Sequence, residues 1–359
     1  MPEPLPHFHA LIMAGGRGTR FWPRSRRSRA KQVLPVLGPA SLIRQTFERL
    51  LPVVPPDRFL IITNAYLQEE IARQLPEVQA NQVIAEPAQR NTAPCIGLAA
   101  RILLDRDPEA VMGVFPADHV ISRPRPFLRV LRGACRTAAG SLVVLGIRPR
   151  WAETGYGYLE LPPSSSPGRP APVRRFCEKP DAATARRFLR SGNFYWNSGM
   201  FVWRASAIER ALRQHLPKTA AALDAIQPDP ASPGFAASLS AHYRRCDNIS
   251  IDYAVLEGAA NIVGFPCPEL GWNDVGSWNA VYDLLRRGRL GNVARSETVF
   301  HDSAGNYVDA PGKLTALVGV EDLIVVDTPD ALLVVRRDRA QQVGEVVKAL
   351  EKRGREELL

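Results

Sequence analysis

The stretch "LIMAGGRGTRFWPRSRRSRAKQVLP", residues 11–35, joins an apolar run to a turn rich in glycine and arginine. The run has the composition of a buried strand, and similar runs follow in "FLIITN", "NQVIAEP", "AVMGVFPADH" and "SLVVLGI". The segments between them have helical spacing, which favours crossover connections and a mostly parallel sheet covered on both faces. We therefore predict a doubly wound α/β fold with ligands at the carboxyl ends of the strands.

Composition excludes several classes of protein. The chain has 359 residues, of which 45% are hydrophobic, and can bury a sizeable core. No apolar stretch approaches the roughly 20 residues of a membrane helix, and the start "MPEPLPHFHA" lacks a secretory pattern, so we expect a cytoplasmic protein without a membrane partner. The five cysteines are widely spaced and contain no C-x-x-C pair, so we expect reduced thiols.

The formal net charge of +10 raises the question of nucleic-acid binding. The arginines are scattered along the chain, however, and a biased composition explains them as well as a binding surface does. A nucleic-acid binder of this kind would show tight, salt-sensitive binding to DNA. We expect no nucleic-acid partner.

The pattern of strands and helices changes along the chain. A tract rich in proline and serine at 162–172 is typical of an exposed hairpin loop. From about residue 295, short β runs follow one another without helices until an amphipathic segment at 340–354. We predict a larger domain over residues 1–290 and a small β domain, ending in a helix, over residues 291–359.

The turn "AGGRGTR" follows the first strand and precedes a helix-compatible stretch, which is the layout of a phosphate-binding loop. Its glycines let backbone N–H groups approach anionic oxygens, and its arginines supply positive charge. The Walker pattern is absent, and Phe21 stands where a dinucleotide fingerprint has its third glycine. Taken alone, a tight strand exit with solvated charge explains the turn equally well.

Two aspartates lie in positions suited to a metal ion, one at the end of an apolar run and one between tryptophans. Asp118 ends the run "FPADHVI", and Asp274 lies in "GWNDVGSW". A hard divalent cation that bridges phosphates needs one or two carboxylates. The alternative is that Asp118 caps a turn and that Asp274, or Ser277, caps the following helix. We expect His119 to be a local hydrogen-bonding group.

Two further motifs carry groups suited to a sugar phosphate and a base. In "FCEKP" and "YWNSGMF", Glu178 accepts, Lys179 donates and Asn197 does both, although a surface ion pair and a turn asparagine explain them too. The motif "EPAQRNTAP" places Glu86 before Asn91 and Thr92 at a helix start, where they either attract an anion or cap the helix.

These motifs in this order resemble the mannose-1-phosphate guanylyltransferases of the nucleotide-sugar pyrophosphorylase group. The likeness runs from "LIMAGGRGTRFWPRSR" through "TGYGYLE" and "ISIDYAVLE" to "VEDLIVVDTPDALLV". It implies a Rossmann-like, glycosyltransferase-A-like nucleotidyltransferase domain followed by a short β-helix-like domain. It also implies that GTP and α-D-mannose 1-phosphate are joined to GDP-mannose and pyrophosphate, with Mg²⁺ as cofactor.

The resemblance assigns roles residue by residue. The implied catalytic residues are Arg20, Lys31, Asp118 and Asp274, with Asp118 and Asp274 as Mg²⁺ ligands. The implied nucleotide-binding residues are Ala14, Gly15, Gly16, Gly18, Thr19, Arg20, Glu86, Asn91 and Thr92. The implied sugar-phosphate-binding residues are Gly157, Glu178, Lys179 and Asn197. A carboxylate such as Glu86 can accept hydrogen bonds from guanine N1–H and the exocyclic amine.

Other interpretations stay open at this point. The chain is alternatively a pyrophosphorylase for another sugar 1-phosphate or nucleotide, or a regulatory relative without catalysis. A homodimer is compatible with the resemblance. We assign no catalytic role to Arg24, Arg26, Arg27 and Arg29, which we expect to be solvated and to steer anions inward.

Overall fold

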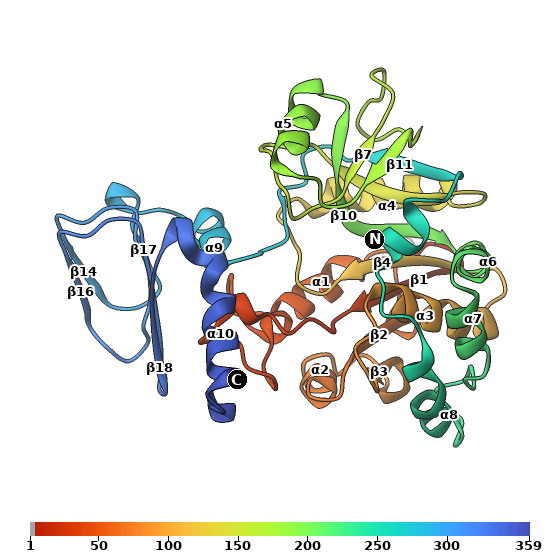
Figure 1. The fold of residues 1–359 in the computed structure, drawn as a ribbon, viewed down its shortest axis with the longest axis horizontal. Helices are drawn as coiled ribbons and strands as arrows, with labels where there is room; N and C mark the ends of the chain where they lie inside the picture. Colours follow the sequence, from red (N-terminus) through yellow and green to blue (C-terminus); the bar gives the residue numbers. More distant parts are fainter. Residues whose placement is uncertain (1–3) are drawn as a thin grey trace.

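The computed structural model describes residues 4–359, which form two parts lying side by side (Figure 1). The larger part contains the predicted α/β sheet. The smaller part, residues 293–359, is called the C-terminal unit below. Across the described residues, no helix combines the length and the apolar character that crossing a membrane requires.

The larger part is organised around a ten-stranded sheet, whose main path has the order β3-β2-β1-β4-β10-β6-β11-β8. Its strands are β1 (Phe8–Met13), β2 (Phe59–Asn64), β3 (Val83–Glu86), β4 (Val111–Pro116), β6 (Leu142–Ile147), β7 (Tyr158–Glu160), β8 (Ala171–Pro172), β9 (Arg175–Cys177), β10 (Phe194–Arg204) and β11 (Ile262–Pro266). The first four strands of this path pair in parallel, as do β6 and β11, whereas β10 runs antiparallel to both its neighbours. The predicted mostly parallel α/β sheet is therefore confirmed.

Helices cover both faces of this sheet. The helices are α1 (Leu42–Leu50), α2 (Gln68–Gln74), α3 (Thr92–Arg106), α4 (Pro124–Thr137), α5 (Ala182–Ser191), α6 (Ala205–His215), α7 (Pro217–Asp224) and α8 (Phe235–His242). A further helix, α9 (Trp278–Leu284), packs instead against the C-terminal unit. Along β1, Ala10 and Ile12 join the core under α1, α2 and α4, whereas Leu11 joins the core under α3 and α6. This alternation buries both faces of the strand, which explains its nearly continuous apolar sequence.

The segment after β1 differs from the sequence prediction. The helix-compatible stretch behind the glycine turn contains only a short 3₁₀ turn, η1 (Thr19–Phe21), and a second one, η2 (Lys31–Val33), before α1 begins at Leu42. The turn instead folds back, because Gly18 has a φ of 61° and a Cβ there would lie 2.7 Å from the Lys31 Cβ. The turn that was predicted to be a phosphate-binding loop is therefore an irregular loop that packs on Lys31.

The C-terminal unit is a short coil of parallel strands that ends in an antiparallel strand. Its strands are β13 (Val293–Ala294), β14 (Thr298–His301), β15 (Tyr307–Asp309), β16 (Thr315–Val318), β17 (Leu323–Thr328) and β18 (Ala331–Arg336), and they are followed by η8 (Arg337–Gln342) and α10 (Val343–Lys352). Strands β13, β15 and β17 pair in parallel, β14 and β16, which alternate with them along the chain, form a second parallel pair, and β18 pairs antiparallel with β17. The predicted β-helix-like domain and its closing helix are thus confirmed. The boundary at residues 290 and 291 stays a prediction, which this change of sheet supports.

A shared apolar core joins the C-terminal unit to the segment after β1. Phe21 and Trp22 pack with Trp278 of α9 and with Tyr307 and Val343 of the C-terminal unit. The indole of Trp22 also donates to the Leu358 carbonyl at 3.0 Å. Buried aromatic groups of this size dominate such contacts, so this core fixes the two parts together.

The arginines of the opening stretch pair with carboxylates of the C-terminal unit. Arg24 lies 2.6 Å from Asp309, Arg26 lies 3.0 Å from Asp330, and Arg27 pairs with Glu356. The expectation that these three side chains are merely solvated is therefore wrong. Their partners lie about 300 positions away in the sequence, where only the folded C-terminal unit brings them close.

Candidate active site

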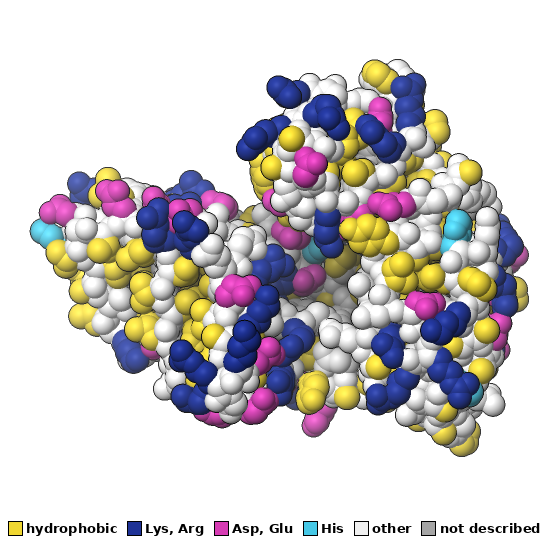
Figure 2. Space-filling model, in the orientation of Figure 1, with side chains coloured by type: hydrophobic (Ala, Val, Ile, Leu, Met, Phe, Trp, Pro, Cys, Tyr) yellow, Lys and Arg dark blue, Asp and Glu magenta, His cyan; other side chains and the backbone are white. Residues whose placement is uncertain are grey.

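A cavity of about 660 Å³ opens at the carboxyl ends of β1, β3 and β4, beneath the lobe that carries β7, β9 and α5. Figure 2 shows the molecule hollowed at this place, with acidic and basic side chains inside. The volume is that of a small-molecule site. The sequence-predicted residues that line it are Ala14, Gly15, Gly16, Glu86, Asn91, Thr92, Asp118, Gly157, Glu178, Lys179, Asn197 and Asp274.

Four of the predicted residues lie beside the cavity and not on its lining: Gly18, Thr19, Arg20 and Lys31. Thr19 and Arg20 belong to η1, which packs against α10. The Arg20 guanidinium donates to the Gln341 side chain at 2.7 Å. Reaching a phosphate in the cavity would therefore require Arg20 to exchange this partner.

Lys31 lies buried directly behind the cavity wall. Its ammonium group is 2.7 Å from Asp118 Oδ2 and donates to the backbone carbonyls of Asp274 and Val275 at 2.8 and 2.9 Å. Lys31 is thus paired with the carboxylate of one predicted metal ligand, Asp118, and bonded to the backbone of the other, Asp274.

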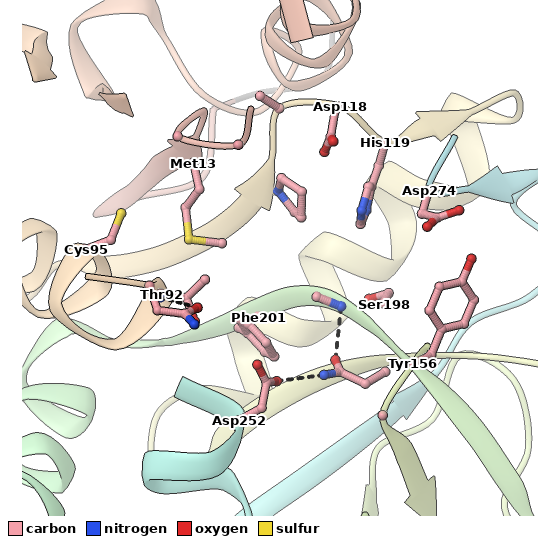
Figure 3. Close-up of a pocket in the computed structure, with 18 of the residues that line it drawn as sticks. Met13, Thr92, Cys95, Asp118, His119, Tyr156, Ser198, Phe201, Asp252 and Asp274 are labelled. Atoms are coloured by element: carbon pink, nitrogen blue, oxygen red, sulfur yellow. Dashed lines mark hydrogen bonds between the residues drawn. The ribbon is translucent and has the colours of Figure 1, made fainter. Parts of the chain in front are cut away.

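A two-stranded ladder explains why Asp118 and Asp274 share one cavity although they are far apart in the sequence. Asp118 lies in the turn between β4 and β5 (Val120–Ile121), and Asp274 follows β12 (Trp272–Asn273). These two short strands pair antiparallel, with Asn273 opposite Val120. Figure 3 shows both carboxylates on the same side of the cavity, together with His119 and Tyr156.

The charges around Asp118 keep it ionised. Burial opposes ionisation, but the positive charge of Lys31 and the bond from its ammonium group outweigh that cost and lower the pKa of Asp118. Burial also lowers the pKa of His119, so the ring is neutral, and Nδ1 accepts from the Trp272 indole at 3.3 Å. The predicted local hydrogen-bonding role of His119 is confirmed.

Asp118 and Asp274 fit a hard divalent cation. Both present carboxylate oxygens to the cavity, and burial together with Asp274 raises the pKa of Tyr156, so its hydroxyl stays a neutral donor beside them. Within residues 4–359, no cluster of three or more His, Cys, Asp or Glu side chains has the arrangement of a self-sufficient metal cage. Mg²⁺ does not need one, because it takes one or two carboxylates and completes its shell with phosphate oxygens and water.

One end of the cavity gathers carboxylates and amides. Burial and the Asp252 carboxylate raise the pKa of Glu178 to about 7, against the opposing charge of Lys179, whose ammonium lies 3.5 Å away. The Asn197 amide donates to Asp252 at 2.8 Å, drawn as a dashed line in Figure 3. A Cβ on Gly157 would lie 2.4 Å from Glu178 Oε2, so only glycine leaves room for that carboxylate.

The other end contains Glu86 and the start of α3. Asn91 has a φ of 65°, and its side chain accepts from the Thr92 backbone at 2.9 Å, while the Thr92 hydroxyl accepts from the Ile251 backbone. The capping interpretation of Asn91 is therefore confirmed by the geometry. Burial raises the pKa of Glu86 to about 7, and a hydrogen bond from the Tyr243 hydroxyl partly opposes this shift.

Comparison with known proteins identifies the family to which this chain belongs. Residues 9–288 match the family described as nucleotidyl transferase, and residues 296–350 match the MannoseP isomerase/GMP-like beta-helix domain. Over 351 residues, the chain is 36% identical to a mannose-1-phosphate guanylyltransferase of Sinorhizobium fredii, covering 96% of this chain and 68% of that protein. The chain belongs to the mannose-1-phosphate guanylyltransferase family.

Two further relatives agree with this family. The alginate biosynthesis protein AlgA of Pseudomonas aeruginosa is 37% identical over 357 residues, covering 97% of this chain and 73% of that protein. A solved structure from Thermus thermophilus, described as a mannose-1-phosphate geranyltransferase, has 34% identity and a TM-score of 0.85, and covers 96% of this chain and 99% of that one. The resemblance to the mannose-1-phosphate guanylyltransferases, inferred from the sequence, is confirmed.

Several cavity residues of this family member were not predicted from the sequence. The Gln32 amide donates to the carbonyls of Ala14 and Gly16 at 2.6 and 2.9 Å and so holds the glycine loop open. Tyr156 and Asp252 line the cavity as well. Each lies inside a motif that the sequence analysis quoted, "KQVLP", "TGYGYLE" or "ISIDYAVLE", so the motifs carried the signal although the individual residues were not selected.

Proposed function

We propose that this chain joins GTP and α-D-mannose 1-phosphate to give GDP-mannose and pyrophosphate. The observation that carries the proposal is one cavity that is lined by the polar groups around Glu178 and around Glu86 and by Asp118 and Asp274, with Lys31 lying 2.7 Å from Asp118 behind the lining. In the proposed reaction, a phosphate oxygen of the sugar phosphate bonds to the α-phosphorus of GTP, and the bond to the β-phosphate breaks. Such a reaction needs positioning and charge neutralisation and no covalent intermediate on the protein.

We propose Mg²⁺ as the cofactor, held by Asp118 and Asp274. When bound, the ion would neutralise charge on the phosphate oxygens and fix the geometry of attack. Lys31, buried 2.7 Å from Asp118, places a second positive charge at the same point. The backbone N–H groups of Gly15, Gly16 and Gly18, with Thr19, would provide donors for the triphosphate, whereas Ala14, whose N–H donates to the Ile62 carbonyl at 2.8 Å, would only line the site. Arg20 would join them on leaving Gln341.

The two ends of the cavity would take different parts of the substrates. Glu178, Asn197 and the backbone at Gly157 offer acceptors and donors to mannose hydroxyls, and Lys179 offers its ammonium to the sugar's phosphate. At its own end of the cavity, Glu86 would accept from guanine N1–H and the exocyclic amine, which adenine does not offer as such a pair. Asn91 and Thr92 shape the loop next to it.

We expect a cytoplasmic enzyme whose partners are its two substrates, without nucleic acid. The ion pairs of Arg24 and Arg26 support this view of the basic stretch, because these charges are already engaged within the chain. A homodimer stays a prediction. Sedimentation velocity of the purified chain checks it, with a single species of twice the chain mass as the expected result.

A pyrophosphate-release assay on the purified chain tests the proposed function. GTP, ATP and UTP are each combined with mannose 1-phosphate and glucose 1-phosphate in the presence of Mg²⁺. We expect the highest kcat/KM for GTP with mannose 1-phosphate. Higher kcat/KM with another pair would assign the cavity to a different nucleotide sugar, and turnover with none of them would overturn the enzymatic proposal.

A further inference from the structure

A buried tyrosine outside the predicted motifs contacts the base-facing end of the cavity. Tyr243 belongs to η5 (Tyr243–Arg245), directly after α8, and its side chain is fully buried. Its hydroxyl donates to Glu86 Oε1. The η5 turn otherwise packs against α7 and α8, and the contact with Glu86 links it to the cavity.

The second oxygen of Glu86 points toward the glycine loop. A Cβ on Gly15 would lie 3.2 Å from Glu86 Oε2, which places that oxygen against the loop proposed to hold the triphosphate. Gly15 and Glu86 both line the cavity. Tyr243 therefore holds the carboxylate from behind, on the side away from the loop, and fixes the rotation of the carboxylate about its last torsion.

A phenol suits this task because it is a neutral donor. Burial and the Glu86 carboxylate raise the pKa of Tyr243 well above its usual value, so the hydroxyl stays protonated and keeps donating. An ionised carboxylate has about four lone-pair positions, and the phenol occupies one of them. The others remain for two parallel donors from a ligand, and the negative charge is not cancelled as it would be by lysine or arginine.

We propose that Tyr243 is a positioning residue that sets nucleobase specificity by orienting Glu86 toward the Watson–Crick edge of guanine. The inference rests on the proposed function, because it takes GTP as the nucleotide. Glu86 would receive guanine N1–H and the exocyclic amine at the same time only if its plane is fixed. Without the Tyr243 hydroxyl, the Glu86 carboxylate would be free to rotate, and its contact with the exocyclic amine in particular would weaken.

The titration of Glu86 supplies an independent signature. Burial raises the pKa of this carboxyl to about 7, and the Tyr243 hydroxyl lowers it. Cys95 and Tyr243 are the titratable groups that interact with it, and both stay neutral because burial raises their pKa values. Guanine binding requires ionised Glu86, so the KM for GTP rises as the pH falls through about 7. Removing the hydroxyl moves this rise to higher pH.

The test compares Tyr243→Phe with Tyr282→Phe in the full chain. Tyr282 is a matched control, because it is also buried and its hydroxyl donates to a carbonyl, that of Gly291, far from the cavity. Initial rates of pyrophosphate release are measured with GTP and with ITP, which lacks the exocyclic amine, from pH 6 to 9. Glu86→Gln is measured in parallel.

We expect Tyr243→Phe to raise the KM for GTP about tenfold, the usual effect of losing a hydrogen bond to a charged group, and to leave the KM for mannose 1-phosphate unchanged. The preference for GTP over ITP falls, the pH profile moves to higher pH, and Tyr282→Phe matches the wild type. Glu86→Gln loses the pH dependence.

Two results would overturn the inference. One is an unchanged preference for GTP over ITP in Tyr243→Phe, with an unchanged pH profile. The other is a wild-type pH profile in Glu86→Gln. Failure of the proposed function looks different, because the wild-type chain itself would then turn over GTP poorly or prefer another nucleotide.

Discussion

Glu86 and Glu178 line one cavity, and each has its pKa raised to about 7, but their neighbours differ. Glu86 meets a neutral phenol, whereas Glu178 lies near the Asp252 carboxylate and the Lys179 ammonium. Burial is the largest cause of the shift in both cases. The same pKa therefore arises in two different surroundings. Loss of the Tyr243 hydroxyl should raise the pKa of Glu86, whereas loss of the Asp252 charge should lower the pKa of Glu178.

The difference matches what each end is proposed to hold. A base offers two donors in a fixed plane, which a single oriented carboxylate accepts. A sugar offers several hydroxyls that both donate and accept, which suits a cluster of carboxyl and amide groups such as Glu178, Asp252 and Asn197. Asp118 and Asp274 line the same cavity and are assigned to neither group, and Lys31 lies 2.7 Å from Asp118 behind the lining.

The largest expected effect comes from substitution of Asp118 or Asp274. Asp118→Asn or Asp274→Asn removes a charge that would hold Mg²⁺, and we expect kcat to fall by about 10²–10³-fold without loss of the fold. Circular dichroism and the Mg²⁺ dependence of turnover check this. A near-normal kcat in either variant would show that the substituted carboxylate is not needed for turnover.

A smaller effect, confined to one end, is expected from Glu178→Gln. Loss of an acceptor for mannose hydroxyls should raise the KM for mannose 1-phosphate about tenfold and leave the KM for GTP nearly unchanged. Glu160→Gln is a suitable control, because Glu160 pairs with Arg175 in the same lobe but does not line the cavity. Equal rises of both KM values would contradict the separation of the two ends.

Asp252, a neighbour of Glu178, offers a test of the direction in which the pKa of Glu178 shifts. Asp252→Asn removes a negative charge but keeps an oxygen that accepts from Asn197. Since Asp252 raises the pKa of Glu178, the pH dependence of the KM for mannose 1-phosphate should move to lower pH, opposite to the shift expected at Glu86 when Tyr243 loses its hydroxyl. A shift to higher pH would show that another neighbour controls Glu178.

The smallest effect is expected outside the cavity. Asp330→Asn breaks the ion pair with Arg26, and Asp330 is half exposed, so the free energy of unfolding should fall by less than about 1 kcal/mol. Urea denaturation measures this change. Both KM values should stay as in the wild type, because the aromatic core around Trp22 and Trp278 still joins the two parts. A marked loss of activity would give this ion pair a part in catalysis.

The sequence predicted the α/β sheet, the β-helix-like end and twelve of the residues that line the cavity, because strand runs and motifs are local patterns. It predicted that Asp118 and Asp274 share one site, but not the β5–β12 ladder that joins their segments. It also did not predict that Arg20 contacts Gln341 or that Tyr243 reaches Glu86 across 157 positions. Nothing near Tyr243 in the sequence marks it as different from an ordinary core tyrosine.

The separation of the two ends is tested most directly by crossing Glu86→Gln with Glu178→Gln. The KM values for GTP and for mannose 1-phosphate are measured in both single variants and in the double variant at pH 8, where both wild-type carboxyls are largely ionised. We predict that Glu86→Gln raises only the KM for GTP, that Glu178→Gln raises only the KM for mannose 1-phosphate, and that the double variant shows both changes independently. If either single variant raises both KM values equally, the two ends do not bind separate substrates.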